Sequence, residues 1–424
     1  MHYFEYQGED LYCEEVPLAR VAEKVGTPCY VYSHRTLVRH FRVFDNAFAD
    51  LPHLICYSVK ANSNLAILRL FFQMGGGADI LSGGELFRVL KAGGNPGKVV
   101  CSGVGKTEQE IMFALRTGIL MFNVESSQEL ELIDRIAGQM GKRASISLRV
   151  NPDVDPKTHP YISTGLKTNK FGIDIRDSLD EYRRARRLAN IDVIGVDCHI
   201  GSQITEIGPF METLSRLSAL VEQLRSEGFD IRFLDMGGGL GITYLDETPP
   251  QPQEYARAII DRVSSLGLTM IFEPGRVIVG NSAILLTKVL FTKKGVSKRF
   301  VVVDAGMNDL VRPSLYDSYH HIQPVRRVSR HKDIVDVVGP VCESGDFLAR
   351  DRQLPEVRPG ELLAVMSAGA YGFSMSSNYN SRPRPAEVMI RGEEIHIIRP
   401  REEYEDLVRG EHIPDFLVAE DPEY

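Results

Sequence analysis

Residues 54–103 read LICYSVKANSNLAILRLFFQMGGGADILSGGELFRVLKAGGNPGKVVCSG, and the organisation of the chain is apparent from this stretch. It holds three short apolar runs separated by amphipathic segments in which apolar residues recur every three or four positions. Such alternation is typical of βα units that build a parallel sheet. The same pattern along the chain predicts eight strands, at 54–60, 78–82, 99–103, 120–126, 146–152, 193–202, 233–239 and 270–276.

Eight strands with intervening helices within about 225 residues predict a (β/α)8 barrel. After residue 282 the pattern changes to apolar runs with turn residues and little helical period, which predicts a mostly β second domain. The run CYVYS at 29–33 is strand-like and precedes the barrel, so we expect it to pair with the second domain. The expected parts are an N-terminal segment at 1–33, a barrel at 34–282 and a C-terminal β domain at 283–424.

The chain has 424 residues, more than one hydrophobic core usually supports, which agrees with two domains. Its composition, 43% hydrophobic and 25% charged, is that of a soluble globular protein. With a net charge of -8 the chain has no overall positive charge to attract nucleic acid. We interpret the four arginines within 183–187 as a solvent-exposed helix face. No apolar run approaches the roughly 18 residues of a membrane helix. We therefore expect neither a nucleic-acid partner nor a membrane.

The six cysteines show no CxxC and no metal-type spacing, so we expect neither a disulfide framework nor a metal site. The segment Met1 to Asp10 is polar and acidic rather than signal-like. Both features favour a cytoplasmic protein.

The first strand supplies a candidate nucleophile. Catalytic groups in such a barrel project from the C-terminal ends of the strands, where the loops meet at one mouth. The first strand ends in YSVKAN, so we expect Lys60 at this mouth. A surface lysine is the ordinary interpretation, because lysine side chains are mostly exposed. Partial desolvation would instead lower the pKa of the amine and let it form a Schiff base.

The sixth and seventh strands add polar groups at the same mouth. The sixth ends in CHIGSQ, which contributes His199 and Ser202, although a purely structural histidine is an equally good interpretation on its own. The seventh ends in MGGGLG at 236–241, where glycines allow backbone N–H groups to approach an anion. A tight turn needs fewer glycines, and phosphate commonly binds at this position of a barrel, so a phosphate loop is favoured.

The eighth strand ends in EPGR at 273–276. An internal salt bridge between Glu273 and Arg276 is the simplest interpretation. Beside a pyridine cofactor the glutamate would instead keep the ring nitrogen protonated, and the arginine would bind phosphate or a substrate carboxylate. The lysine, the histidine, the glycine-rich loop and the glutamate are together the groups that pyridoxal 5'-phosphate (PLP) chemistry needs in one pocket.

Seven short motifs occur in one order along the chain: YSVKAN, SGGEL, HIGSQ, GGGLG, EPGR, CESGD and AGAYG. In this order and spacing the sequence resembles the diaminopimelate decarboxylases, from about residue 10 to the C-terminus. These PLP enzymes consist of an alanine-racemase-like barrel and a β domain. The resemblance therefore implies the same two-domain fold that the periodicity predicts.

The resemblance also implies roles around the cofactor. Lys60 would hold PLP covalently, His199 would lie over the face of its ring, and Glu273 would be the partner of its ring nitrogen. Further positions near the cofactor are matched by Asp79, Ser82, Arg149, Ser202, Gly238, Gly239, Gly275, Arg276 and Tyr371.

The second domain would supply the substrate end of the site. By the resemblance, Arg312 and Tyr316 bind the carboxylate of the substrate's distal, L-configured centre, and Glu343 binds its ammonium group. Cys342 matches a proposed proton donor, whereas a buried, small hydrophobic residue is the usual role of a cysteine. In the family the CESGD loop reaches the active site of the other subunit, so the resemblance implies an obligate homodimer. Residues matched to contacts with both cofactor and substrate are Arg276 and Tyr371.

The implied reaction is the decarboxylation of meso-diaminopimelate to L-lysine and CO2, the last step of a bacterial lysine pathway. Decarboxylases of ornithine, lysine or arginine share the scaffold, but they typically carry a CDxxD-type loop where this chain has CESGD, and Arg312 would then lack a carboxylate to bind. Decarboxylases selective for D-configured diamino acids are excluded less firmly. A non-catalytic PLP-binding or partner-binding relative is a further alternative, although such relatives tend to lose the lysine or the glycine loop.

Overall fold

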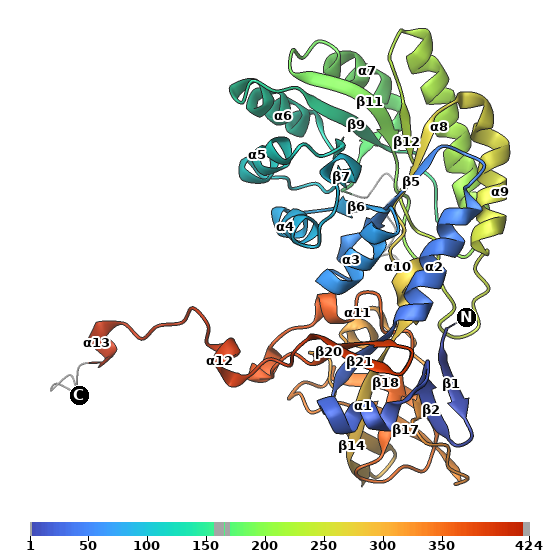
Figure 1. Cartoon of the computed structure of the whole chain (residues 1–424), viewed down its shortest axis with the longest axis vertical. Helices are drawn as coiled ribbons and strands as arrows, with labels where there is room; N and C mark the ends of the chain where they lie inside the picture. Colours follow the sequence, from blue (N-terminus) through green and yellow to red (C-terminus); the bar gives the residue numbers. More distant parts are fainter. Residues whose placement is uncertain (1, 157–164, 166–169, 419–424) are drawn as a thin grey trace.

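The computed structural model describes residues 2–156, 165 and 170–418, which form two lobes joined along the barrel mouth (Figure 1). The upper lobe in this view is a ring of parallel strands with helices outside it, and the lower lobe is mostly strands. The N-terminal strands lie in the lower lobe, together with the strands from β14 (Ala283–Lys294) onward.

The eight predicted barrel strands are confirmed. Neighbouring strands are parallel throughout, and the ring closes where the last strand pairs with the first, Met270 opposite His53. In ring order the strands are β5 (His53–Ser58), β6 (Gly77–Ile80), β7 (Val99–Cys101), β8 (Met121–Val124), β9 (Ala144–Asn151), β11 (Ile191–Asp197), β12 (Phe233–Asp235) and β13 (Thr269–Phe272). All eight predicted runs extend beyond the observed C-terminal ends, because the residues there leave the sheet to form the loops of the mouth. A further two-residue strand, β10 (Ile173–Asp174), pairs with β9.

Helices cover the outside of the ring. Several begin at a side chain that accepts a hydrogen bond from the backbone of the first turn, for example Ser33, Asn64, Thr107 and Ser126. The helices are α2 (His34–Ala47), α3 (Leu65–Gln73), α4 (Gly83–Lys91), α5 (Glu108–Thr117), α6 (Ser127–Gln139), α7 (Ile175–Ala185), α8 (Gly208–Ser226) and α9 (Pro252–Val263). Their apolar faces complete one large core with the strands.

The second lobe is built on a sheet in the order β18-β17-β15-β14-β4-β20-β21. The N-terminal strand β4 (Cys29–Ser33) lies inside it, antiparallel to β14 (Ala283–Lys294) and parallel to β20 (Ala386–Arg391). The other strands are β15 (Arg299–Val303), β17 (Lys332–Val338), β18 (Phe347–Pro355) and β21 (Glu394–Arg399), with β16 (Ile322–Pro324) and β19 (Leu362–Val365) attached to β14.

Shorter elements complete the chain. A separate three-stranded sheet precedes helix α1 (Leu18–Val25) and comprises β1 (Phe4–Gln7), β2 (Asp10–Cys13) and β3 (Val16–Pro17). Short helices α10 (Arg276–Val279) and α11 (Arg312–Tyr316) lie near the mouth, and α12 (Tyr404–Leu407) and α13 (Asp415–Val418) extend away from the body (Figure 1). No helix in the described ranges is both long enough and apolar enough to cross a membrane.

The two lobes meet in direct, buried hydrogen bonds. Asn62, just past the first barrel strand, donates to the hydroxyl of Tyr32 at 2.9 Å and to the carbonyl of Gly369 at 3.2 Å. The N–H of Tyr371 donates to the carbonyl of Ala61 at 2.8 Å. A side chain at Gly369 would not fit, because its Cβ would lie 1.9 Å from the carbonyl oxygen of Val279. The β domain is therefore held against the barrel mouth.

Candidate active site

A pocket opens at the C-terminal end of the barrel, against the β domain. Groups predicted from strands one, six, seven and eight meet here with a tyrosine of the second domain. The predicted residues that line it are Lys60, His199, Ser202, Gly238, Gly239, Glu273, Gly275, Arg276 and Tyr371.

Lys60 lies in a short 3-10 turn, η1 (Val59–Ala61), immediately after β5. Its ammonium nitrogen is 3.0 Å from Oδ2 of Asp79, a fully buried carboxylate on the neighbouring strand β6. Burial lowers the pKa of Lys60, but the carboxylates of Asp79 and Glu273 outweigh it, and the pKa lies above its usual value. The expectation of a lowered pKa is therefore wrong for the protein alone, because the sequence does not reveal the paired aspartate.

Glu273 follows the end of β13 and is 4% exposed. Its Oε1 receives long hydrogen bonds from Nδ2 of Asn123, at 3.3 Å, and from Oγ of Ser102, at 3.4 Å. The guanidinium of Arg276 instead donates to the hydroxyl of Tyr244 and to Oγ of Ser202. The interpretation of EPGR as an internal salt bridge is therefore wrong, and both groups are available to the pocket.

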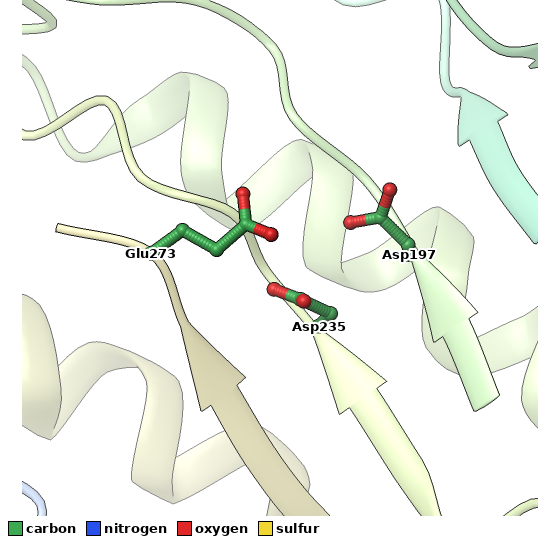
Figure 2. A group of neighbouring side chains, drawn as sticks. All are labelled: Asp197, Asp235 and Glu273. Carbon is green, nitrogen blue, oxygen red and sulfur yellow. The ribbon is translucent and has the colours of Figure 1, made fainter. Parts of the chain in front are cut away.

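Two further carboxylates lie beside Glu273, as Figure 2 shows. Asp197 ends β11 and Asp235 ends β12, so three adjacent parallel strands direct their acids to one point. One oxygen of each lies within 4.8 Å of one oxygen of each of the others. Burial, and then the neighbouring acids, raise the pKa of Asp197 and Glu273 well above the usual values, and burial raises the pKa of Asp235 to about 7.

His199 is fixed by the glycine-rich loop. Its Nδ1 accepts a hydrogen bond of 3.1 Å from the N–H of Gly238, so the ring proton of the neutral imidazole is on Nε2. Burial, and then the positive charges of Lys60 and Arg149, hold the pKa of His199 well below its usual value. The imidazole is therefore neutral at physiological pH.

The glycine loop requires glycine for two reasons. Gly237 and Gly239 have φ of 63° and 108°, conformations that other residues adopt only with strain. At Gly238 a Cβ would lie 2.3 Å from the carbonyl oxygen of Glu273. The loop therefore runs close to the neighbouring strand end at the rim of the pocket.

Two buried arginines share one tyrosine at the rim. Nη1 of Arg276 donates to the hydroxyl of Tyr244 at 2.7 Å, and the guanidinium of Arg312 lies 5.0 Å from the centre of the same ring. Arg276 also lies 5.0 Å from the ring of Tyr371, and its Nε is buried without a hydrogen-bond partner. Burial raises the pKa of Tyr244, but the positive charges of Arg276 and Arg312 outweigh it, so the pKa lies below its usual value. This buried pair of cations suits a site for anionic groups. Tyr316, at the end of α11, is partly buried beside it.

Cys342 and Glu343 lie on an exposed loop and do not line the pocket of their own chain. The N–H of Cys342 donates to Oδ1 of Asn380 at 2.7 Å. The buried carboxylate of Asp346 anchors the loop by accepting from the N–H groups of Met307 and Val341, each at 2.6 Å. The loop is thus well fixed while its two predicted functional side chains face outward.

Comparison with known proteins agrees with this geometry. Residues 34–280 match the family model described as "Pyridoxal-dependent decarboxylase, pyridoxal binding domain". The diaminopimelate decarboxylase of Vibrio cholerae is 55% identical over 409 residues, which cover 96% of this chain and 98% of that relative. The diaminopimelate decarboxylase of Pseudomonas aeruginosa is 52% identical over 97% of this chain and 99% of its own. This chain belongs to the diaminopimelate decarboxylase family.

Solved structures of the family share the fold. The diaminopimelate decarboxylase of Helicobacter pylori, solved with L-lysine, superposes with a TM-score of 0.90 at 45% identity, covering 92% of this chain and 98% of that one. A lysine/ornithine decarboxylase of Vibrio vulnificus has a TM-score of 0.78 at 20% identity, which shows a common fold alone.

The residues at the pocket fit the cofactor of the diaminopimelate decarboxylase family, PLP. The guanidinium of Arg276, which lines the pocket, has a buried Nε without a hydrogen-bond partner, and Oδ1 of Asp79, beside Lys60, is likewise unpartnered. Lys60 offers an amine, Glu273 a carboxylate for a ring nitrogen, and the glycine loop a close backbone surface for phosphate.

Three of the predicted cofactor residues, Asp79, Ser82 and Arg149, lie beside the pocket rather than in its lining. Asp79 pairs with Lys60 at 3.0 Å. Arg149 on β9 is buried, pairs with Glu125 at 2.7 Å and reaches the carbonyl of His199 at 3.4 Å. Ser82 caps helix α4, its Oγ accepting from the N–H of Glu85 at 3.2 Å. Their assignment to the cofactor stays a prediction.

Other residues at the site were not singled out from the sequence. Asp197 and Asp235 occur within predicted strands rather than at the strand ends where catalytic groups are expected. Tyr244 follows the glycine loop in an irregular segment, and Asn123 is a polar residue in the middle of a strand. A polar residue inside an apolar strand was the available signal for Asn123 and the two aspartates, because buried polar groups need partners.

Proposed function

We propose that this protein decarboxylates meso-diaminopimelate to L-lysine and CO2, the last step of lysine biosynthesis. The chain is a PLP-dependent carboxy-lyase of its family. The observation that carries the proposal is that a place for the cofactor and a place for anionic groups lie next to each other at the mouth of the barrel. Lys60 and Glu273 frame a place for the cofactor, while Arg276 and Arg312 at the rim provide charge for anionic groups.

PLP, when bound, supplies an electron sink for the electron pair that the departing carboxylate leaves behind. We assign Lys60 to its covalent attachment, Glu273 to its ring nitrogen and His199 to its ring. The loop with Gly238 and Gly239 is assigned to its phosphate. The remaining cofactor assignments are Asp79, Ser82, Arg149, Ser202, Gly275, Arg276 and Tyr371.

Asp79 controls the proton on Lys60. The ion pair at 3.0 Å keeps this amine as an ammonium group in the protein alone, which is not nucleophilic. Oδ1 of Asp79 is buried and unpartnered, so the same carboxylate has an acceptor free for the proton that Lys60 must release. The neutral imidazole of His199 adds no positive charge beside this amine. Asp79 is therefore expected to set the pH at which Lys60 reacts.

Arg312 and Tyr316 are assigned to the distal carboxylate of the substrate. Both arginines are buried, so bidentate contacts with a carboxylate form away from bulk water. Arg276 and Tyr371 are assigned to contacts with both cofactor and substrate. The guanidinium of Arg276 lies 5.0 Å from the centre of the Tyr371 ring.

Cys342 and Glu343 are assigned to the active site of the partner subunit in a homodimer. The exposure of this anchored loop, outside the pocket of its own chain, supports the assignment. Cys342 would deliver the proton to the substrate carbon, and Glu343 would bind the distal ammonium group. We further propose a cytoplasmic location, in keeping with the absence of CxxC pairs in the sequence, and a PLP-binding unit at 34–282 with 1–33 assigned to the β domain at 283–424.

A substrate panel tests the function. The purified protein with added PLP is supplied with meso-diaminopimelate, D-lysine, L-lysine and L-ornithine, and CO2 release is measured for each. Turnover of diaminopimelate at least a hundredfold faster than of the others is expected, because only that substrate fills the site of Arg312 with a carboxylate. Faster turnover of a substrate with a single carboxylate would contradict the proposal.

A further inference from the structure

The carboxyls of Asp197, Asp235 and Glu273 form a buried cluster whose charge no cation balances (Figure 2). Among the residues that the structure describes, none forms an ion pair with any of the three. The nearby cations are engaged elsewhere, since Lys60 pairs with Asp79 at 3.0 Å and Arg149 pairs with Glu125 at 2.7 Å. Three ionised carboxylates could not remain this close in a dry interior.

The donors around the cluster are also too few. Oδ1 of Asp235 accepts from the N–H of Gly237 at 2.9 Å. Nδ2 of Asn123 donates both to Oδ2 of Asp235, at 3.4 Å, and to Oε1 of Glu273, at 3.3 Å. Oδ1 of Asp197 is buried with no partner. The titratable and charged groups that face Asp235 from the surrounding elements are Cys56, Asp79, Asp197, Cys198, Tyr255 and Glu273. All of these groups are neutral or acidic, so none supplies a positive charge. Some of the three carboxyls must therefore be protonated.

A metal ion would fit these contacts poorly. The NH2 group of Asn123 is directed at an oxygen of Asp235 and at one of Glu273, where its partial positive charge would oppose a cation. The same donor is compatible with carboxyl groups that share protons.

We propose that Asp235 is a positioning residue for Glu273: a proton shared between their carboxyl groups fixes the glutamate, with Asp197 as the third member of the cluster. Two protons on three carboxyls leave one negative charge, which a protonated ring nitrogen of PLP balances. The proposal rests on the assignment of Glu273 to that nitrogen. Asp235 thereby keeps Glu273 aligned and singly charged toward the cofactor.

Cofactor affinity as a function of pH tests the proposal. The protein stripped of PLP is titrated with PLP at pH 6 and pH 9, and the Kd is measured from the visible absorbance of the bound cofactor. Asp235→Asn replaces the shared proton by an amide N–H that pH does not remove. The ratio of the wild-type Kd to that of Asp235→Asn is expected to rise at least tenfold, and at most about a hundredfold, from pH 6 to pH 9, because each pH unit above a pKa near 7 contributes tenfold.

The comparison cancels the titration of Lys60 and of PLP itself, which both proteins share. Asp309→Asn is the matched control, because Asp309 is a buried acid of the β domain whose pKa burial raises to about 7, and its ratio should change less than threefold. A ratio for Asp235→Asn that changes less than tenfold overturns the proposal. Glu273→Gln separates the two assignments: PLP affinity equal to wild type would remove Glu273 from the ring nitrogen, whereas weakened affinity with a flat Asp235→Asn ratio would remove Asp235 alone.

A second readout needs no change at Asp235. Infrared spectra of the wild-type protein at pH 6 are expected to show a C=O stretching band of a protonated carboxylic acid that shifts when PLP is added. Asp309→Asn identifies the contribution of Asp309 to that region. The absence of any PLP-sensitive carboxylic acid band contradicts the proposal even if the variant fails to fold.

Discussion

The ion pair between Lys60 and Asp79 gives a quantitative prediction for Asp79→Asn. At 3.0 Å and an effective dielectric constant near 20, the attraction is about 5 kcal/mol, or roughly four pKa units. The Lys60 side chain is 30% exposed and Glu273 still attracts it in the variant, so we reduce this to a fall of about one to two units in the pKa of Lys60. The amide would still accept a hydrogen bond, and the geometry would be largely kept.

The assay follows the rate at which the PLP-free protein captures PLP, by visible absorbance, from pH 6 to pH 10. The deprotonated amine reacts, so below the pKa of Lys60 the rate is proportional to the small deprotonated fraction, and Asp79→Asn should raise the rate at a given pH by at least about tenfold, since each unit of pKa is a factor of ten. Glu129→Gln is the matched control, since it breaks a buried lysine–carboxylate pair at 2.7 Å with Lys106, away from the pocket. An unchanged rate in Asp79→Asn across this pH range, or an equal increase in Glu129→Gln, would refute the reasoning.

The other predictions concern the substrate end, the dimer and stability. Arg312→Lys should raise the KM for diaminopimelate about ten- to a hundredfold with a smaller change in kcat, measured by steady-state CO2 release, because lysine cannot bind a carboxylate bidentately. Mixing Lys60→Ala with Cys342→Ala chains should restore about a quarter of wild-type activity if each site uses Cys342 of the other subunit, and inactivity of the mixture would exclude sharing. Burial raises the pKa of Asp309 from its usual value to about 7, so the native state binds more protons than the unfolded state between about pH 4 and 7, and stability falls as pH rises through this window. Asp309→Asn should remove up to about 2.6 kcal/mol of that loss between pH 5 and pH 8, measured by chemical denaturation, and an undiminished loss would contradict the assignment.

The barrel was predictable because strand and helix periods alternate clearly, and the strand-end rule then located Lys60 and Glu273 at one mouth. The sequence could not show how these side chains are paired. Lys60 was expected to be desolvated with a lowered pKa, yet Asp79 on the next strand reverses the shift, and only the parallel register brings the two together.

The buried acids show a second limit of pattern reading. Asp235 resembles an ordinary polar residue in a strand. Its importance depends on Asp197, its partner on one adjacent strand, and on Glu273, which lies two residues beyond its partner Ile271 on the other. Tyr244, which bridges toward both arginines, lies in an irregular segment where no periodicity marks its direction. Such convergence depends on tertiary structure.

The central claim is that Lys60 carries the cofactor. Borohydride reduction of the PLP-loaded protein, followed by proteolysis and mass spectrometry, tests it directly. We expect a single phosphopyridoxyl group on the peptide that contains Lys60, and none in Lys60→Ala. A modified peptide from another lysine, or no stable adduct after loading with PLP, would contradict the account.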